Sequence, residues 1–577
     1  MAFLHSNSRR NAAAAAGASL LLLMLVLSLS VPTRHGHGQG QRQGGGVFSG
    51  SATRGSCQEE LRALDGRAAR CRYVKSRPPC APVGYVDYLA AFYCGEWPAW
   101  ACGVAMAAWL AVLFYLLGDT ASEYFCASLE GLSAALGLPP AIAGATLLPL
   151  GNGAPDVLSS LVAFSSSSDG DDGAGDVGLS GVLGGALFVS TVVAGTVALV
   201  AARKSRGGGA GVVIERPGFV RDACFLLVAL CYLLAVLITG AVTVWAAAAF
   251  LSLYVAYVLL VWTSHCCSET HAAYDDDDDS STKPPCDNDD LAAPLLPVVG
   301  SSNSKTGSTT TGPSGPRRPL LALLLAALHS PLYLPRRLTI PDIAAHRWSR
   351  PSAIASALLS PLLIAATTTT PSLTALLAGA LTGILLAIAA ALTTNPCAPP
   401  QARARLPWLA GGFLMSVLWS YLLAQELVSL LVSAAVIAGV PASVLGVTVL
   451  AWGNSVGDLV SDVAMAAVSD AGARTAVAGC YAGPAFNTVV GLGLSLAVAA
   501  AARYPEPYEV PVEASAYVTV GFLAAGLAWA LAVLPARGMR LDAVLGAGLI
   551  LVYLCFLAVR LADAVGVVSL DSLLTRP

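Results

Sequence analysis

The chain has 577 residues, of which 56% are hydrophobic and only 12% are charged, and its formal net charge is −3. A soluble protein would carry about twice that share of charged residues, and apolar runs of about 20 residues recur, so the composition predicts a multi-pass membrane protein. The near-neutral charge gives no reason to expect a nucleic-acid partner. The sequence has no Walker loop, dinucleotide fingerprint or catalytic Cys–His or Ser–His signature, so we do not expect an enzyme.

The N-terminal region predicts entry into the secretory pathway. Residues 1–32 hold an apolar run between Arg9–Arg10 and a glycine-rich stretch, which is typical of a signal peptide or an uncleaved signal anchor. Either alternative places residues 33–97 outside the cytosol. This short polar segment has an even number of cysteines, for which two disulfides are expected with the pairing left open: Cys57, Cys71, Cys80 and Cys94. The final membrane stays open between the plasma membrane, the vacuole and other endomembranes.

Apolar runs predict twelve membrane helices, or thirteen if the N-terminal run is retained. Residues 98–263 hold five of them, near 98–118, 138–164, 178–202, 221–239 and 242–263. Residues 264–350 contain an aspartate run and a stretch rich in Ser, Thr, Gly and Pro. This composition cannot bury a core, so it predicts a disordered loop.

The second half of the chain repeats this pattern after an insertion. Residues 351–407 supply an extra helix pair and a linker, with helices near 352–369 and 372–393. Residues 408–577 hold five more helices, near 408–431, 441–468, 475–502, 515–534 and 542–563. Lys and Arg are concentrated in the loops 203–221 and 264–350, so we expect these loops in the cytosol.

The most informative feature is an internal repeat. Residues 138–164, "LPPAIAGATLLPLGNGAPDVLSSLVAF", align with residues 440–466, "VPASVLGVTVLAWGNSVGDLVSDVAMA", at a constant offset of 302. The most similar parts are two motifs, 144–164 and 446–466. Five helices and the extra pair separate the repeats, so the second repeat should cross the membrane in the opposite direction. Inverted repeats of this kind build alternating-access transporters with a site near mid-membrane.

Four acidic residues lie well inside the predicted helices: Asp156, Glu426, Asp458 and Asp462. No Lys or Arg is placed to neutralise them, and an unpaired carboxylate in hydrocarbon costs several kcal/mol. A mobile cation is therefore the expected partner. Asp462 is interpreted as a neighbour of the site or a residue at its mouth, and Glu426 as either a path residue or a residue at a wet helix end.

The remaining polar residues of the repeats are hard oxygen donors: Asn152, Asn454, Asn487 and Ser455, with Thr146 and Thr448 at lower weight. Such donors suit Ca²⁺, Na⁺, K⁺ or Mn²⁺, whereas zinc and copper carriers need His or Cys clusters. Five residues are expected to interrupt two helices and free carbonyls beside a cavity: Gly151, Gly153, Pro155, Gly453 and Gly457. Close helix packing is the alternative role for a single glycine-rich motif.

The motifs "GNGAPD" at 151–156, "GNSVGD" at 453–458 and "AGPAFN" at 482–487 resemble the sodium/calcium exchanger (cation/Ca²⁺ antiporter) superfamily, and most of all its plant cation/calcium exchanger branch. The resemblance implies an all-α exchanger fold of two inverted five-helix repeats. It also implies Asp156 and Asp458 as central cation ligands, with a neighbouring set of Asn152, Asn454, Ser455 and Asn487.

The chain also departs from that family pattern. Many members carry Glu where this chain has Asp156 and Asp458. Val189 stands where others have Asn or Asp, while its counterpart in the second repeat is Asn487. The departure implies that one sodium or potassium subsite is altered or missing.

The function predicted from these features is secondary active cation antiport, with Ca²⁺ or Mn²⁺ exchanged against Na⁺, K⁺ or H⁺. The helices 98–118 and 408–431 would rock against the rest. The expected partners are inorganic cations and the lipid bilayer, and no cofactor is expected. The alternatives are a cation channel or uniporter that uses the same acids, and a non-transporting receptor or scaffold.

Overall fold

Almost all of the chain that the structure describes is helical. The structure is a computed structural model, and it describes residues 57–76, 84–136, 140–167, 172–206, 211–274, 332–344, 347–367, 372–396, 398–400, 404–510 and 514–564. Two short strands, β1 (Ala241–Val242) and β2 (Tyr508–Glu509), pair antiparallel and join a loop of the first repeat to a loop of the second. The predicted all-α membrane fold is confirmed.

Each repeat consists of five long helical stretches. The first is built from α5 (Ala99–Thr120), η2 (Ala121–Cys126), α6 (Ala127–Leu136), α7 (Pro140–Ser167), α8 (Asp172–Phe188), η3 (Val189–Val193), α9 (Ala194–Arg206), α10 (Arg216–Thr239) and α11 (Val244–Tyr274). The second is built from α16 (Arg405–Ala438), α17 (Ala442–Leu445), η7 (Gly446–Leu450), α18 (Ala451–Val468), α19 (Asp470–Phe486), η8 (Asn487–Leu492), α20 (Gly493–Arg503), α21 (Ala514–Ala536) and α22 (Ala543–Ala564). The η segments are single turns of π-helix.

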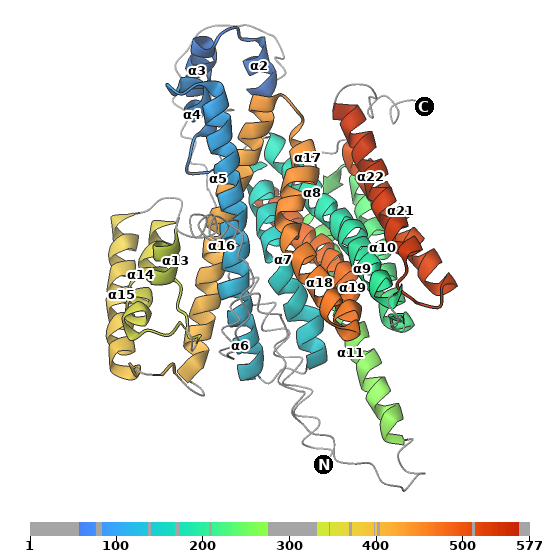
Figure 1. The fold of residues 1–577 in the computed structure, drawn as a ribbon. Coiled ribbons are helices and arrows are strands. Elements are labelled where there is room, and N and C mark those ends of the chain that lie inside the picture. The colour runs from blue at the N-terminus through green and yellow to red at the C-terminus, as the bar shows by residue number, and fades with distance from the viewer. Residues whose placement is uncertain are drawn as a thin grey trace, which may run out of the picture.

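Ten helical stretches within the described residues are long and apolar enough to cross a membrane. The 28-residue α7 also has the required length. Between the repeats lie α13 (Tyr333–Thr339), α14 (Arg350–Ala366) and α15 (Leu373–Thr393), and the last two form an antiparallel pair to one side (Figure 1). Five crossings plus this pair precede α16, so the second repeat is inverted relative to the first.

Two predicted boundaries are wrong. The first helix does not end near residue 118, because α5, η2 and α6 continue to Leu136 although the sequence turns polar at Asp119 and Glu123. Nor is all of 264–350 a disordered loop, because α11 extends to Tyr274 and α13 is a helix within that range. Acidic residues of the first place pair with arginines of the second, Asp119 with Arg336 and Glu123 with Arg347. Composition alone does not show such pairs.

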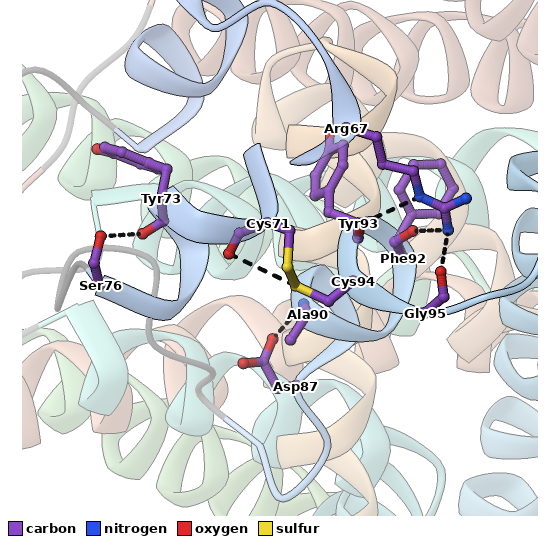
Figure 2. The surroundings of a disulfide bond; sticks show 10 residues. All are labelled: Arg67, Cys71, Tyr73, Ser76, Asp87, Ala90, Phe92, Tyr93, Cys94 and Gly95. Carbon is purple, nitrogen blue, oxygen red and sulfur yellow. Dashed lines mark hydrogen bonds between the residues drawn. A yellow bond between two sulfur atoms is a disulfide. The ribbon is translucent and has the colours of Figure 1, made fainter. Parts of the chain in front are cut away.

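A small cap covers one end of α5 and α16 (Figure 1). It consists of α2 (Cys57–Ala63), α3 (Arg67–Ser76) and α4 (Tyr88–Cys94). Cys71 and Cys94 form a disulfide, and Cys57 is also disulfide-bonded, whereas Cys80 lies outside the described residues. Arg67 donates hydrogen bonds to carbonyls at and just beyond the end of α4, those of Phe92, Tyr93 and Gly95 (Figure 2). It also donates to the carbonyl of Trp97.

Candidate cation site between the repeats

The two repeats meet through crosswise contacts between their second and third helices. The backbone of Gly184 on α8 approaches η7 so closely that a Cβ there would lie 2.8 Å from the Cα of Val447. In the same way, a Cβ at Gly491 on η8 would lie 3.2 Å from a methyl group of Val157 on α7. The second helix of each repeat is therefore packed closely against the third helix of the other repeat.

Asp156 sits at this junction and is 7% exposed. One carboxylate oxygen accepts a hydrogen bond from Nδ2 of Asn454 on α18 at 2.8 Å. The other accepts from Nδ2 of Asn487 on η8 at 2.6 Å. A carboxylate of the first repeat is thus held by two amides of the second, and the three side chains form a single polar cluster.

Further oxygens of the cluster have no hydrogen-bond partner among the described residues: Asn454 Oδ1, Asn487 Oδ1 and Ser455 Oγ. Leaving a buried acceptor unpaired costs about 1–3 kcal/mol. Across from Asp156 the backbone of Gly185 leaves room, because a Cβ there would lie 3.7 Å from both Asp156 Oδ2 and Ser455 Oγ. Carboxylate, amide and hydroxyl oxygens around such a space are the ligand types that hard cations prefer.

Asp458 adds a second charge next to this cluster. It lies one turn beyond Asn454 on α18, is half-buried, and is close enough to Asp156 and Asp462 for their negative charges to repel. Within the described part of the chain, no ion pair joins a Lys or Arg to Asp156, Asp458 or Asp462. Among the described residues, no three His, Cys, Asp or Glu side chains lie close enough together to hold a metal ion by themselves. The donors are therefore mixed carboxylate, amide and hydroxyl oxygens.

Other predicted site residues lie apart from the cluster. Asn152 is on α7 one turn before Asp156, but its side chain is exposed. Thr448 donates its hydroxyl proton to the carbonyl of Val444 at 2.5 Å, within its own helix. The side chain of Thr146 lies outside the described residues. Among the described side chains, neither Asn152 nor Thr448 hydrogen-bonds to Asp156.

Asp462 and Glu426 have their own partners. The thiol of Cys480 on α19 donates to Asp462 Oδ2 at 3.5 Å. Glu426, on α16, accepts hydrogen bonds from the backbone N–H of Tyr85 and from the hydroxyl of Tyr88. Glu426 thus fastens the cap to α16 and is 9% exposed, so its helix does not end before it.

The predicted helix interruptions are absent. Gly151, Gly153 and Pro155 lie inside the continuous α7, and Gly453 and Gly457 lie inside α18. A proline removes only one hydrogen bond of the helix ladder, and packing against neighbouring helices holds the rest of the segment. The carbonyl of Gly151 still loses its usual donor, because Pro155 has no N–H.

The two halves of the site are not equivalent. Val189 begins η3 as Asn487 begins η8, and both are buried. An isopropyl group therefore occupies the position at which the second repeat presents an amide to Asp156.

Sequence reasoning did not single out three residues of the first repeat. Gly185 provides the space opposite Asp156, and its only signal was the doubled glycine at 184–185. Asp119 and Glu130 lie on the continuation of the first helix, beyond its predicted end. Their signal was the apolar sequence that resumes after residue 123.

The chain is similar to known proteins over most of its length. The family model described as "Sodium/calcium exchanger protein" matches residues 106–263 and 408–562, which are the two repeats. Cation/calcium exchanger 1 of Arabidopsis thaliana is 42% identical over 89% of this chain and 90% of its own length. The human mitochondrial sodium/calcium exchanger protein is 31% identical over 87% and 89%. A crystal structure of the H⁺/Ca²⁺ exchanger CAX is 11% identical over 88% of this chain and 93% of its own, with a TM-score of 0.41.

Proposed function

Because this chain belongs to the sodium/calcium exchanger protein family, we propose that it is a secondary active antiporter that moves Ca²⁺, or Mn²⁺, against Na⁺, K⁺ or H⁺. Its relatives are named as exchangers of calcium, sodium or other cations. The oxygen donors of this chain suit the same ions. The substrate site comprises Asp156, Asn454, Ser455, Asp458 and Asn487.

The observation that carries the proposal is the cluster around Asp156. Its carboxylate comes from one repeat and its two amide partners from the other, with unpartnered oxygens of Asn454, Asn487 and Ser455 beside it. A cation held there would contact both repeats at once. Any rearrangement of one repeat relative to the other would then change the access of that cation to the two sides of the membrane.

The charges of Asp156 and Asp458 also explain why the flux of one cation should be coupled to the flux of another. Asp156 and Asp458 would place two negative charges in a low-dielectric region when no cation is bound, and such a state is costly. The protein should therefore reorient with a cation loaded in each direction. α5 and α16, which flank the core helices, would rock against them.

The test is ion counter-flow in proteoliposomes with Ca²⁺, Mn²⁺, Na⁺, K⁺ and pH varied separately. We expect Ca²⁺ uptake to require a cation on the opposite side, and Asp156→Asn or Asp458→Asn to abolish it. Asp470→Asn is the matched control, because that acid forms only a surface ion pair with Lys204. Wild-type flux from the Asp458→Asn protein would contradict the proposal.

A cation channel or uniporter with the same acids makes a different prediction. It would pass current down a gradient without a cation on the opposite side. Uptake that is independent of the opposite-side cation, together with sensitivity to Asp156→Asn, would favour that alternative.

A further inference from the structure

A buried arginine ties the segment between the repeats to the first helix. Arg336, on α13, is 0% exposed. Its Nη1 forms an ion pair with Asp119 Oδ2 at 2.8 Å and donates to Thr120 Oγ1 at 2.9 Å. The carbonyl of Leu116 lies 3.5 Å from the same nitrogen. A single guanidinium therefore holds the last turn of α5.

This contact lies at the depth of the membrane-spanning helices. Asp119 is about 30 Å along the helix from Ala99, at 1.5 Å per residue. On α13, Thr339 receives a hydrogen bond from Nε1 of Trp419 at 2.7 Å, and Trp419 lies about 20 Å into α16 from its start. Figure 1 shows α13 beside α14, between the two ends of α15. α13 therefore lies against both α5 and α16.

A second arginine fixes the next turn. Nη2 of Arg347 donates to the carbonyl of Glu123 at 2.8 Å, and Nη1 pairs with the Glu123 carboxylate. The guanidinium lies over the ring of Tyr124, 5.1 Å from its centroid, and also pairs with Asp342 at 2.8 Å. The segment around α13 thus binds the first helix on both sides of residue 121, at Asp119–Thr120 and at Glu123.

Residue 121 begins η2, the π-helical turn that runs from these arginine contacts to Cys126, which lies against the GNGAPD motif. At the end of η2, the sulfur of Cys126 lies against Gly151, so that a Cβ there would be only 2.8 Å from it. The ring of Phe125 packs on Phe413 of α16, with centroids 5.1 Å apart. π-Turns weaken the local helix ladder and recur at functional sites. The position of η2 therefore depends on what holds the turn before it.

We propose that Arg336 is a positioning residue for transport. By holding Asp119 and Thr120, it sets the position of η2, and η2 keeps Cys126 against Gly151 of the GNGAPD motif. The segment between the repeats thereby becomes part of the moving unit formed with α5 and α16. This inference rests on the proposed antiport, because its effect is read in the transport rate.

The test compares three variants in proteoliposomes. Arg336→Met removes the guanidinium from Asp119, Arg336→Lys keeps the charge but not the planar fork of donors, and Arg336→Met with Asp119→Asn removes both charges. Since no cation ligand changes, we expect the maximal Ca²⁺ flux to fall about 10- to 100-fold with Arg336→Met, with the half-saturating concentration within about twofold of wild type. Arg336→Lys should recover part of the rate.

The double variant separates positioning from stability. It leaves no unpaired buried charge, so we expect a wild-type melting temperature with the flux still reduced. Arg537→Gln is the matched control: this exposed arginine pairs with Asp542 in the second repeat, and its loss should keep the wild-type rate. A double variant with wild-type flux, or an equal loss with Arg537→Gln, would overturn the proposal.

A readout independent of transport uses Cys126. In a background that keeps Cys126 and the four cap cysteines, with the other cysteines replaced by alanine, N-ethylmaleimide should label Cys126 slowly, because it is buried. We expect at least about tenfold faster labelling with Arg336→Met and with the double variant. Unchanged labelling would refute the coupling, whereas an absence of counter-flow in the wild-type protein would instead refute the antiport.

Discussion

Replacing Gly153 by alanine should weaken cation binding although no proposed ligand is replaced. A Cβ at this position would overlap Asn487 Oδ1 and lie 3.0 Å from Asn487 Cγ and 3.1 Å from a ring carbon of Phe486. Asn487 must then shift, and its 2.6 Å hydrogen bond to the buried Asp156 carboxylate is lost. A hydrogen bond to a charged group is worth about 1.5–3 kcal/mol, so the affinity should fall about 10- to 100-fold.

The assay is the half-saturating Ca²⁺ concentration for counter-flow, with the Ca²⁺-dependent rise in melting temperature as a measure of binding. Gly457→Ala is the control, since a Cβ at Gly457 would meet no atom within 4 Å. A double-mutant cycle with Asn487→Ala identifies the cause, because the alanine at 153 should add little once the amide is gone. Wild-type affinity for Gly153→Ala, or additive losses in the cycle, would refute the reasoning.

Three further predictions concern the cap and the first repeat. Replacing Cys71 and Cys94 by alanine opens a disulfide between residues 23 apart in sequence, which should destabilise the cap by about 3 kcal/mol and make it sensitive to proteolysis at lower temperature; an unchanged digestion profile would contradict this. Burial, and then the Glu426 charge, raise the pKa of Tyr88 above its ordinary 10.0. The folded protein therefore holds this proton more tightly than the unfolded chain does. The resulting stability is complete below about pH 10 and is lost at higher pH, so the melting temperature of Tyr88→Phe should fall less steeply than that of wild type above pH 10. Val189→Asn supplies the amide that the second repeat carries at Asn487; we expect a changed dependence of Ca²⁺ flux on Na⁺ or K⁺, and identical ion dependence would show that position 189 does not face the ions.

The repeat pattern allowed much of the site to be predicted. Asp156 and Asp458 stand 302 positions apart in matching motifs, and a charge repeated in an apolar helix has few explanations other than an ion. Asn454, Asn487 and Ser455 were expected from their oxygen donors and from the family resemblance, and the structure gathers these three around Asp156. Local spacing sufficed because each motif fits within a few helical turns.

The errors arose where composition and distant contacts disagree. Asp119 and Glu123 looked like the end of a helix, but Arg336 and Arg347 pair with them from more than 200 positions away. The same arginines made α13 look like part of a polar loop. A sequence shows that charges are present but not which ones will meet, and a buried pair has a different cost from two separate charges.

The sequence by itself determined the membrane class, the inverted repeat, the family and the acids at the centre of each repeat, because hydrophobicity and a duplicated motif are read along the chain. Only the tertiary structure decided which oxygens face Asp156, which predicted donors point elsewhere, and that the segment between the repeats grips the first helix. Those outcomes depend on how closely two helix backbones approach. At Gly153 and Gly184 that approach is set by the absence of a single carbon atom, and its effect appears only when the partner helix is in place.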